Sequence, residues 1–493
     1  MNTLSFASTA RCRTGIEGLD EVLRGGLPRD RMYLVLGEPG VGKTTLGLQF
    51  LLEGVKAGEK GLYITLSETK AELHEVATSH GWDLSQIELF ELSAMEAQIR
   101  SDTDNSFFSP SEVELNRTTR VLLEVIENSK PVRVVFDSLS EMRLMSETAL
   151  RYRRQIMHLK QFFSGTKCTV LMLDDSAGSG NVDEQVESLA HGVIVLNKTS
   201  PAFGVSRRQL RVQKIRGVKF REGNHDLLMD TGGLLVFPRL VASEYCTPFA
   251  GESMKSGIGG LDQLLGGGID RGTSSIFMGP AGTGKSSLAM RFACSAAERA
   301  ENVLYYTFDE TLRTLLGRSD QLGFNLEGHL KAQRIKVQQI DPAEISPGEL
   351  AYRISQAVLH DAVRLVVIDS LNGFLHAMPD ERHLTLQLHE LLSFLNQQGV
   401  ATLMVLTQQG LVGSMTAPVD LTYLADTVIL TRYFEADGAV RQAISVIKKR
   451  SGDHERTIRE FKILPGGIEV GDPLHGFQGV LTGVPTMPRM HTP

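Results

Sequence analysis

Two eight-residue segments of the chain carry the residue types that hold the phosphates of a nucleotide. They read Gly37-Glu-Pro-Gly-Val-Gly-Lys-Thr44 and Gly279-Pro-Ala-Gly-Thr-Gly-Lys-Ser286, and their lysines lie 242 residues apart. Glycines let successive backbone N–H groups turn toward phosphate oxygens, the lysine reaches the β- and γ-phosphates, and the following hydroxyl ligates Mg²⁺. The predicted nucleotide contacts are Gly37, Gly40, Val41, Gly42, Lys43, Thr44 and Thr45 in the first segment, and Gly279, Gly282, Thr283, Gly284, Lys285, Ser286 and Ser287 in the second.

Each segment lies between an apolar run and a stretch with helical spacing. The apolar runs are residues 33–36 and 275–278, and the helical stretches are residues 46–51 and 288–293. This order predicts a strand, a loop and a helix whose N-terminus adds a positive end to the phosphate site. One match could be an ordinary glycine turn, but two matches in the same context favour two nucleotide sites.

Two aspartates each end a β-branched run. Asp137 closes residues 132–137 and Asp369 closes residues 364–369, and both runs are typical of buried parallel strands. An aspartate in this position, downstream of a phosphate loop, predicts a further Mg²⁺ ligand, so the predicted metal ligands are Thr44, Asp137, Ser286 and Asp369. The alternative is an aspartate that only caps the next helix.

Acidic residues also follow the strand after each phosphate loop. The pairs are Ser67-Glu68 and Asp309-Glu310. A carboxylate just past a strand end can polarise a water molecule held against a γ-phosphate, which makes Glu68, Asp309 and Glu310 candidate catalytic residues. The alternative is surface charge where a strand meets solvent.

The two halves of the chain repeat one another. Thr14-Gly-Ile-Glu-Gly-Leu-Asp20 precedes the first loop and Ser256-Gly-Ile-Gly-Gly-Leu-Asp262 the second, again 242 residues apart. Strands alternate with helices in each half, which predicts an α/β fold with a mainly parallel sheet flanked by helices. We expect domains at residues 1–246 and 247–485, a short flexible tail at 486–493, and a ten-residue insertion in the first domain around 101–111.

Composition limits the classes of protein that the chain can belong to. It has 493 residues, 42% of them hydrophobic and 22% charged, and a formal charge of −7, which fits a folded protein without a global basic field for nucleic acid or anionic membranes. The four cysteines form no C-x-x-C pair, which argues against a zinc site or a disulfide framework and for a reducing compartment. No apolar run is long enough to span a membrane, so we expect a cytoplasmic protein.

These motifs together resemble the KaiC family of RecA-like ATPases and autokinases of the circadian clock. The resemblance covers residues 14–483 and depends on the tandem loops, the T-G-I-x-G-L-D phrase, the double acid and the D-S-L sequence at Asp137 and Asp369. It implies two tandem RecA-like P-loop NTPase domains, and a homohexamer of two stacked rings with ATP and Mg²⁺ between subunits. The family's general base falls on Ser67 and Asp309. Serine cannot act as this base, so the first site would hydrolyse ATP slowly or depend on Glu68.

The family also supplies cations to a neighbouring subunit's ATP through a K-x-R turn. The matching residues are Lys214 and Arg216 in the first repeat, and Lys448 and Arg450 in the second. Residues two apart on a strand share a face, so each pair could reach one phosphate group. The alternative is a solvated basic strand. Such a strand is weak evidence for nucleic-acid binding, because no base-stacking element accompanies it.

Two hydroxyl residues match the family's adjacent phosphorylation sites. They are Thr422 and Tyr423, and the larger tyrosine would place its oxygen elsewhere. Autophosphorylation on Thr422 is therefore the hypothesis, and the alternative is that both residues only pack at a subunit interface. The chain stops about ten residues after Gly483, which argues against a KaiA-type activator, whereas a KaiB-like partner on the first ring stays open.

The sequence is compatible with three functions. The first is a double-ring ATPase and Ser/Thr autokinase that acts as a slow timer or signalling switch. The second is a RecA-like DNA-binding motor or recombination factor, against which the acidic charge counts. The third is a nucleotide-gated scaffold in which one ring binds ATP without turnover, and Ser67 favours it for the first ring.

Overall fold

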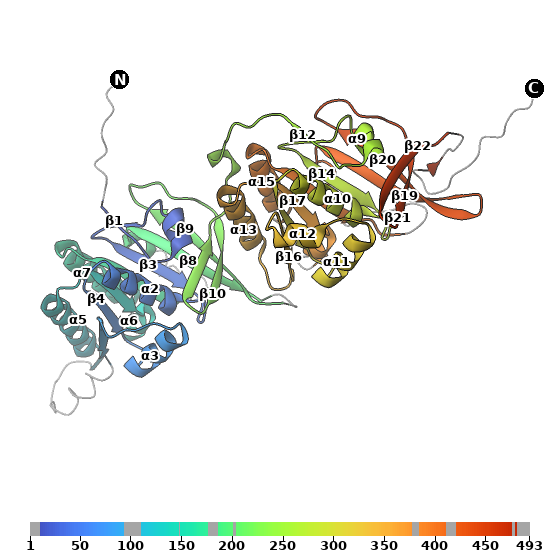
Figure 1. Cartoon of the computed structure of the whole chain (residues 1–493). Helices are drawn as coiled ribbons and strands as arrows, with labels where there is room; N and C mark the ends of the chain where they lie inside the picture. The colour runs from blue at the N-terminus through green and yellow to red at the C-terminus, as the bar shows by residue number, and fades with distance from the viewer. Residues whose placement is uncertain are drawn as a thin grey trace, which may run out of the picture. The chain divides into compact units, whose positions relative to one another are not determined.

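The computed structural model describes residues 10–92, 110–146, 148–175, 186–200, 204–376, 384–410, 421–475 and 479–480. The chain divides into two compact units, residues 1–239 and 240–493, seven residues ahead of the expected boundary. Figure 1 colours the first unit from blue to green and the second from green to red. Most of the predicted insertion and all of the predicted tail lie outside the described residues.

The first unit is built on a sheet of nine strands among the described residues. In spatial order the strands are β11 (Gly233–Phe237), β10 (Asn224–Asp230), β9 (Arg207–Ile215), β8 (Gly192–Thr199), β3 (Met32–Gly37), β7 (Thr169–Asp175), β6 (Arg133–Asp137), β4 (Gly61–Thr65) and β5 (Ile87–Glu91). The six strands from β8 to β5 are parallel, and β9, β10 and β11 extend the sheet as antiparallel neighbours.

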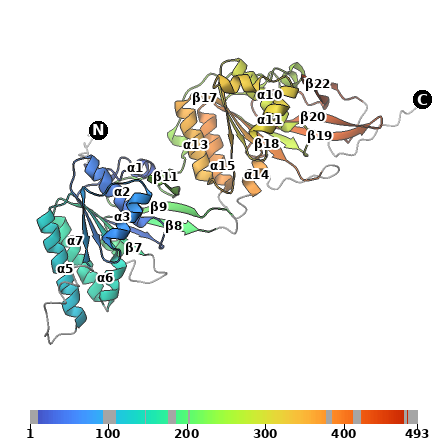
Figure 2. The same ribbon diagram turned by 60° about the horizontal axis from the view of Figure 1, so that its bottom comes forward.

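Helices flank this sheet, as Figure 2 shows. They are α1 (Glu17–Val22), α2 (Lys43–Lys56), α3 (Lys70–Ser79), α5 (Pro110–Ser129), α6 (Leu139–Met145) and α7 (Ala149–Gly165), and a small ladder pairs β1 (Arg11–Cys12) with β2 (Leu27–Pro28). The hydrophobic cores on the two sides of the sheet are separate clusters, because successive strand residues point to opposite faces. The parallel strands are buried on both faces, which explains their nearly unbroken apolar runs.

The second unit repeats this plan. Its sheet, again nine strands within the described ranges, runs β16 (Ile335–Gln339), β15 (Asn302–Thr307), β17 (Val363–Asp369), β18 (Ala401–Thr407), β14 (Ser274–Gly279), β19 (Thr427–Ala436), β20 (Ala439–Lys449), β21 (Arg459–Leu464) and β22 (Gly467–Pro473). Its helices are η1 (Ala242–Glu244), α9 (Gly259–Leu264), α10 (Lys285–Glu298), α11 (Leu312–Gln321), α12 (Leu326–Lys331), α13 (Pro347–His360), α14 (Leu371–His376) and α15 (Leu384–Gln397), with a short ladder of β12 (Ser253–Met254) and β13 (Ile269–Asp270). The tandem α/β architecture predicted from the sequence is confirmed.

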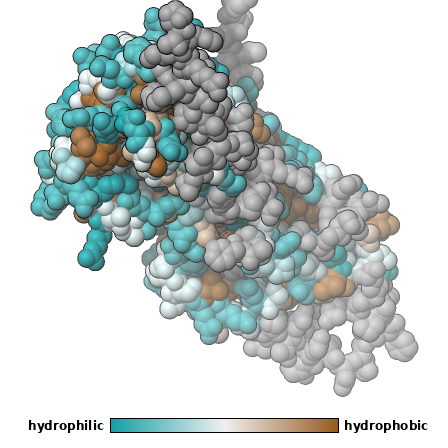
Figure 3. All heavy atoms as spheres, turned by 90° about the vertical axis from the view of Figure 1, so that its right-hand side faces the viewer, coloured by the Kyte–Doolittle hydropathy of each residue, from teal (hydrophilic) through white to brown (hydrophobic). Residues whose placement is uncertain are grey.

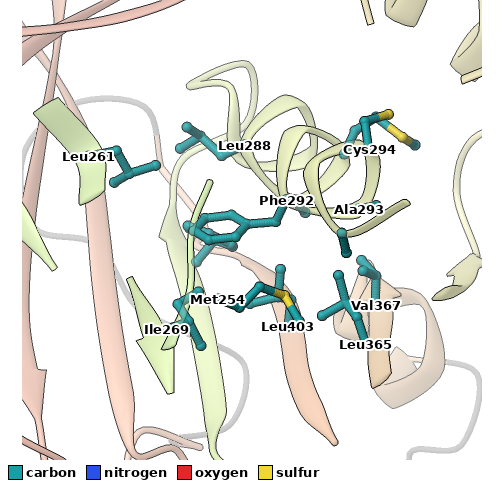
Figure 4. Close-up of a cluster of buried hydrophobic side chains, with 14 of the residues drawn as sticks. Met254, Leu261, Ile269, Leu288, Phe292, Ala293, Cys294, Leu365, Val367 and Leu403 are labelled. Carbon is teal, nitrogen blue, oxygen red and sulfur yellow. The ribbon is translucent and has the colours of Figure 1, made fainter. Parts of the chain in front are cut away.

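The helix after the phosphate loop anchors one of the two cores of the second unit. Phe292 of α10 is fully buried and points from the helix toward the sheet, where Leu365, Val367 and Leu403 lie (Figure 4). Burying a side chain of this size contributes about 1.5–3 kcal/mol, so the core fixes α10, and with it the loop that precedes it, against the strands.

On the face shown in Figure 3, hydrophobic residues form small groups among hydrophilic ones. No helix in the described part of the chain is both long and apolar enough to cross a membrane.

Candidate nucleotide sites

Both predicted phosphate loops lie between a buried strand and a helix. The first follows β3 and leads into α2, and the second follows β14 and leads into α10. Gly42 and Gly284 directly precede the helices with φ of 113° and 89°, a left-handed conformation that only glycine adopts without strain. Each loop therefore ends in the backbone turn that aims the first N–H groups of the helix outward, as anion binding at a helix N-terminus requires.

The two lysines of the loops have different partners. The Lys43 Nζ donates to the carbonyls of Gly37 and Glu38 at 2.8 and 3.0 Å and forms an ion pair with Asp175 at 2.8 Å. The Lys285 Nζ donates to the Pro280 carbonyl at 2.6 Å, and burial lowers its pKa to about 8. Both ammonium groups thus lie over their own loop, where a phosphate would replace carbonyl contacts.

The hydroxyl after each lysine contacts the strand-ending aspartate. Thr44 Oγ1 donates to Asp137 Oδ2 at 3.2 Å, and Ser286 Oγ donates to Asp369 Oδ1 at 2.9 Å. Both aspartates are about 6% exposed, and each is the last residue of its strand, β6 or β17. The hydroxyl and the carboxylate that were predicted as metal ligands are therefore in contact in both units, because the carboxyl ends of parallel strands meet at one edge of the sheet.

A tyrosine that the sequence reading did not select binds each of these aspartates. Tyr63 Oη donates to Asp137 Oδ2 at 2.6 Å, and Tyr305 Oη donates to Asp369 Oδ2 at 2.5 Å. Burial raises the pKa of both aspartates, and the tyrosine and hydroxyl donors lower it. The repeat offered a signal for these residues, since the two tyrosines also lie 242 residues apart.

The acids after β4 and β15 are held by a tight turn. Thr65 Oγ1 donates to the Glu68 carbonyl and accepts from the Glu68 N–H, and Thr307 and Glu310 repeat this pattern. Asp309 is turned toward the next strand, where its carboxylate accepts a hydrogen bond from the Ser370 hydroxyl.

The two glutamates differ in their surroundings. Burial, with Asp137 adding repulsion, raises the pKa of Glu68 to about 7, and one Glu68 carboxylate oxygen is buried without a hydrogen-bond partner among the described atoms. Glu310 instead forms an ion pair with Arg318, Oε2 to Nη2 at 2.8 Å. Burial raises the pKa of Glu310, and Arg318 lowers it.

A pocket surrounds the second phosphate loop. Its lining includes the predicted residues Gly282, Gly284, Lys285, Ser286, Ser287, Asp309, Glu310 and Asp369, together with Arg318, Gln321, Leu322 and Ile463. The structure thus brings the loop, the aspartate and both acids of the second unit to one concave surface, as expected of a small-molecule site.

The donor set at each loop suits Mg²⁺. One hydroxyl and one carboxylate are hard oxygen ligands, and Mg²⁺ commonly takes few protein ligands and completes its shell with water and nucleotide phosphates. Within the described ranges no cluster of three or more His, Cys, Asp or Glu side chains could hold a metal on its own.

The basic turns lie beside backbone carbonyls of their own unit. Lys214 donates to the Glu187 carbonyl, and Arg216 to the Ser188 carbonyl at 2.6 Å. These contacts hold the two side chains at the edge where β8 begins and β9 ends.

In the second unit the basic turn and the predicted phosphosites lie together. Lys448 donates to the Thr422 carbonyl at 2.9 Å, and Arg450 donates to the Tyr423 carbonyl at 3.0 Å and lies 3.6 Å from Asp426. None of these residues is among the described residues that line the pocket at the second loop.

Each unit contains a strand, a glycine loop and a helix, and the loop hydroxyl is bound to a carboxylate on a parallel strand of the same sheet. This arrangement defines a RecA-like P-loop NTPase domain, and the chain contains two. The family model described as "ATPase: KaiC" matches residues 12–241 and 254–475, so the chain belongs to the KaiC family of ATPases.

Curated relatives cover nearly the whole chain. A circadian clock oscillator protein KaiC from Parathermosynechococcus lividus is 26% identical over 482 residues, 96% of this chain and 88% of the relative. The protein of the same name from Synechococcus elongatus is 25% identical, over 98% of this chain and 93% of the relative. That from Prochlorococcus marinus subsp. pastoris is 27% identical, over 96% and 93%.

Proposed function

We propose that both units bind ATP with Mg²⁺ and hydrolyse it at the interfaces of a double-ring homohexamer, and that the second unit phosphorylates Thr422. The observation that carries the proposal is the repeated set of loop lysine, hydroxyl, buried aspartate and glutamate. The relatives are named circadian clock oscillator proteins, which supports a role as a slow timer or signalling switch.

Each side chain has one task in this mechanism. The loop lysine binds β- and γ-phosphate oxygens, and the hydroxyl and aspartate of each site hold the metal. Bound Mg²⁺ would supply positive charge to the phosphates. In the first site Glu68 orients the attacking water and accepts its proton, and in the second site Asp309, which Ser370 holds, and Glu310 are the two candidates for this task.

The placement of the basic turns supports transfer between subunits. Lys448, Arg450, Thr422 and Tyr423 form one group, and they do not line the pocket of their own phosphate loop. This separation supports phosphoryl transfer to the hydroxyls from ATP that a second copy of the chain presents. Lys214 and Arg216 would serve the first ring in the same way.

The test measures free phosphate and protein-bound label together, after incubation of size-fractionated protein with γ-phosphate-labelled ATP. We expect slow release and label on Thr422 in a hexamer-sized fraction. Lys285→Ala should abolish the label and leave assembly intact, whereas Lys43→Ala should dissolve the ring. Release that is fast, unlabelled and stimulated by single-stranded DNA would refute the autokinase and support a DNA motor.

A further inference from the structure

Arg318 is a cation in the pocket of the second phosphate loop to which no role has been given. It lies on α11, eight residues after Glu310, and lines the pocket together with Lys285, Ser286 and Asp369. Its Nη2 lies 2.8 Å from Glu310 Oε2, and its side chain is 30% exposed. The guanidinium therefore lies beside one of the two candidate acids of the proposed mechanism.

The first unit shows that the fold does not need this arginine. The residue eight positions after Glu68 is Val76, which lies on α3 and packs against the hydrophobic core. The same helix forms in both units, and the side chains of Thr69 and Thr311 both accept a hydrogen bond from the backbone N–H three residues on. Arg318 is thus a difference between the sites and not a requirement of the helix.

The acidic side chains around the second pocket favour a cation at this position. Asp309, Glu310 and Asp369 all line it, and Arg318 forms an ion pair with one of them, Glu310. A guanidinium has five N–H donors in a planar fork, and the contact with Glu310 uses one nitrogen, Nη2. The other donors can bind phosphate oxygens while the ion pair persists.

We propose that Arg318 binds the terminal phosphate of ATP in the second site, from the same subunit as the phosphate loop, and at the same time orients Glu310. The inference rests on the proposed function, because it requires ATP in that pocket. It adds a specificity residue that distinguishes ATP from ADP, and the first site, with Val76, lacks it.

The test is calorimetric titration of the full chain, in Mg²⁺, with ADP and with a non-hydrolysable ATP analogue. Loss of a binding isotherm in Lys285→Ala identifies the second site. Arg318→Met should weaken the ATP analogue at that site about 10- to 100-fold and change ADP binding less than about threefold, because only the analogue carries the terminal phosphate. Arg318→Lys should recover part of the loss.

Arg313→Met is the matched control, since Arg313 is exposed on the same helix and does not line the described pocket. It should bind both nucleotides like the wild type. Equal weakening of ADP and analogue in Arg318→Met, or no weakening of either, would overturn the inference and leave the proposed function standing. A wild-type protein without any isotherm that Lys285→Ala removes would overturn both.

Discussion

The hydroxyl of Tyr305 should stabilise the second unit measurably, because it holds a buried carboxylate. Tyr305 is fully buried, its Oη lies 2.5 Å from Asp369 Oδ2, and Ser286 donates to the other oxygen, Oδ1. Tyr305→Phe keeps the ring and leaves Oδ2 without its donor. A hydrogen bond to a charged group contributes about 1.5–3 kcal/mol, and the burial of both groups favours the upper part of that range.

The equivalent change in the first unit should cost less. Tyr63 and Thr44 both donate to Oδ2 of Asp137, so Tyr63→Phe leaves Thr44 on the same oxygen. We expect a loss near the lower limit, about 1.5 kcal/mol. The geometry thus predicts the size of each loss of stability and also that the loss is larger for Tyr305→Phe than for Tyr63→Phe.

Hydrogen exchange read by mass spectrometry measures these losses unit by unit in the full chain. The amides of β17 in Tyr305→Phe should exchange roughly 10- to 150-fold faster, which corresponds to about 1.5–3 kcal/mol. Tyr306→Phe is the control, because Tyr306 is also buried and its hydroxyl has no hydrogen bond recorded within the described residues. If Tyr305→Phe and Tyr306→Phe exchange alike, the hydroxyl does not stabilise Asp369.

Two further predictions concern the first unit. The pKa of Glu68 is about 7 in the folded protein and 4.5 ordinarily, so folding favours its protonated form. The nucleotide-free wild type should therefore lose stability between pH 4.5 and 7. Glu68→Gln should show no such loss and should be more stable than the wild type at pH 8, by on the order of 1–2 kcal/mol after solvent screening. Urea midpoints at pH 5 and pH 8 test this, and parallel curves would contradict it. Arg133 is 1% exposed and donates to Glu59 at 2.6 Å and to two backbone carbonyls. Arg133→Leu should destabilise the first unit by about 3 kcal/mol in urea unfolding, even though leucine, as Leu365, takes the equivalent strand position in the second unit. An unchanged midpoint would show that these hydrogen bonds do not stabilise the first unit.

The sequence predicted those parts of the site that lie close together along the chain. A phosphate loop is a local turn, and its glycines, lysine and hydroxyl are fixed by a single motif. Asp137 and Asp369 were predictable because a parallel strand ends at the edge where the loop lies, whichever strands are its neighbours. The α/β class followed from the alternation of apolar strands and helices.

Contacts between strands could not be predicted in this way. Tyr63 reaches Asp137 because β4 pairs with β6, in a register that sets Thr65 against Asp137, and no local pattern states which strands are neighbours. Arg318, on α11, forms an ion pair with Glu310, which lies in the turn at Thr307. Both contacts depend on tertiary structure, and only the comparison of the two repeats could have drawn attention to them.

The differences between the repeats lie where the fold leaves residues free to vary. Lys43 has an acidic partner, Asp175, at the end of β7, whereas β18 ends in Thr407 and the described residues give Lys285 no ion pair. For the glutamates it is the second unit that has the ion pair. Glu310 pairs with Arg318, whereas Val76 stands at the equivalent position, eight residues after Glu68. In the first unit the loop lysine is thus paired with an opposite charge, and in the second unit the glutamate is. Under the proposed function, ATP at the first site would compete with Asp175 for Lys43, whereas in the second site Arg318 already pairs with Glu310. Two sites on one fold should therefore differ in nucleotide affinity and in turnover.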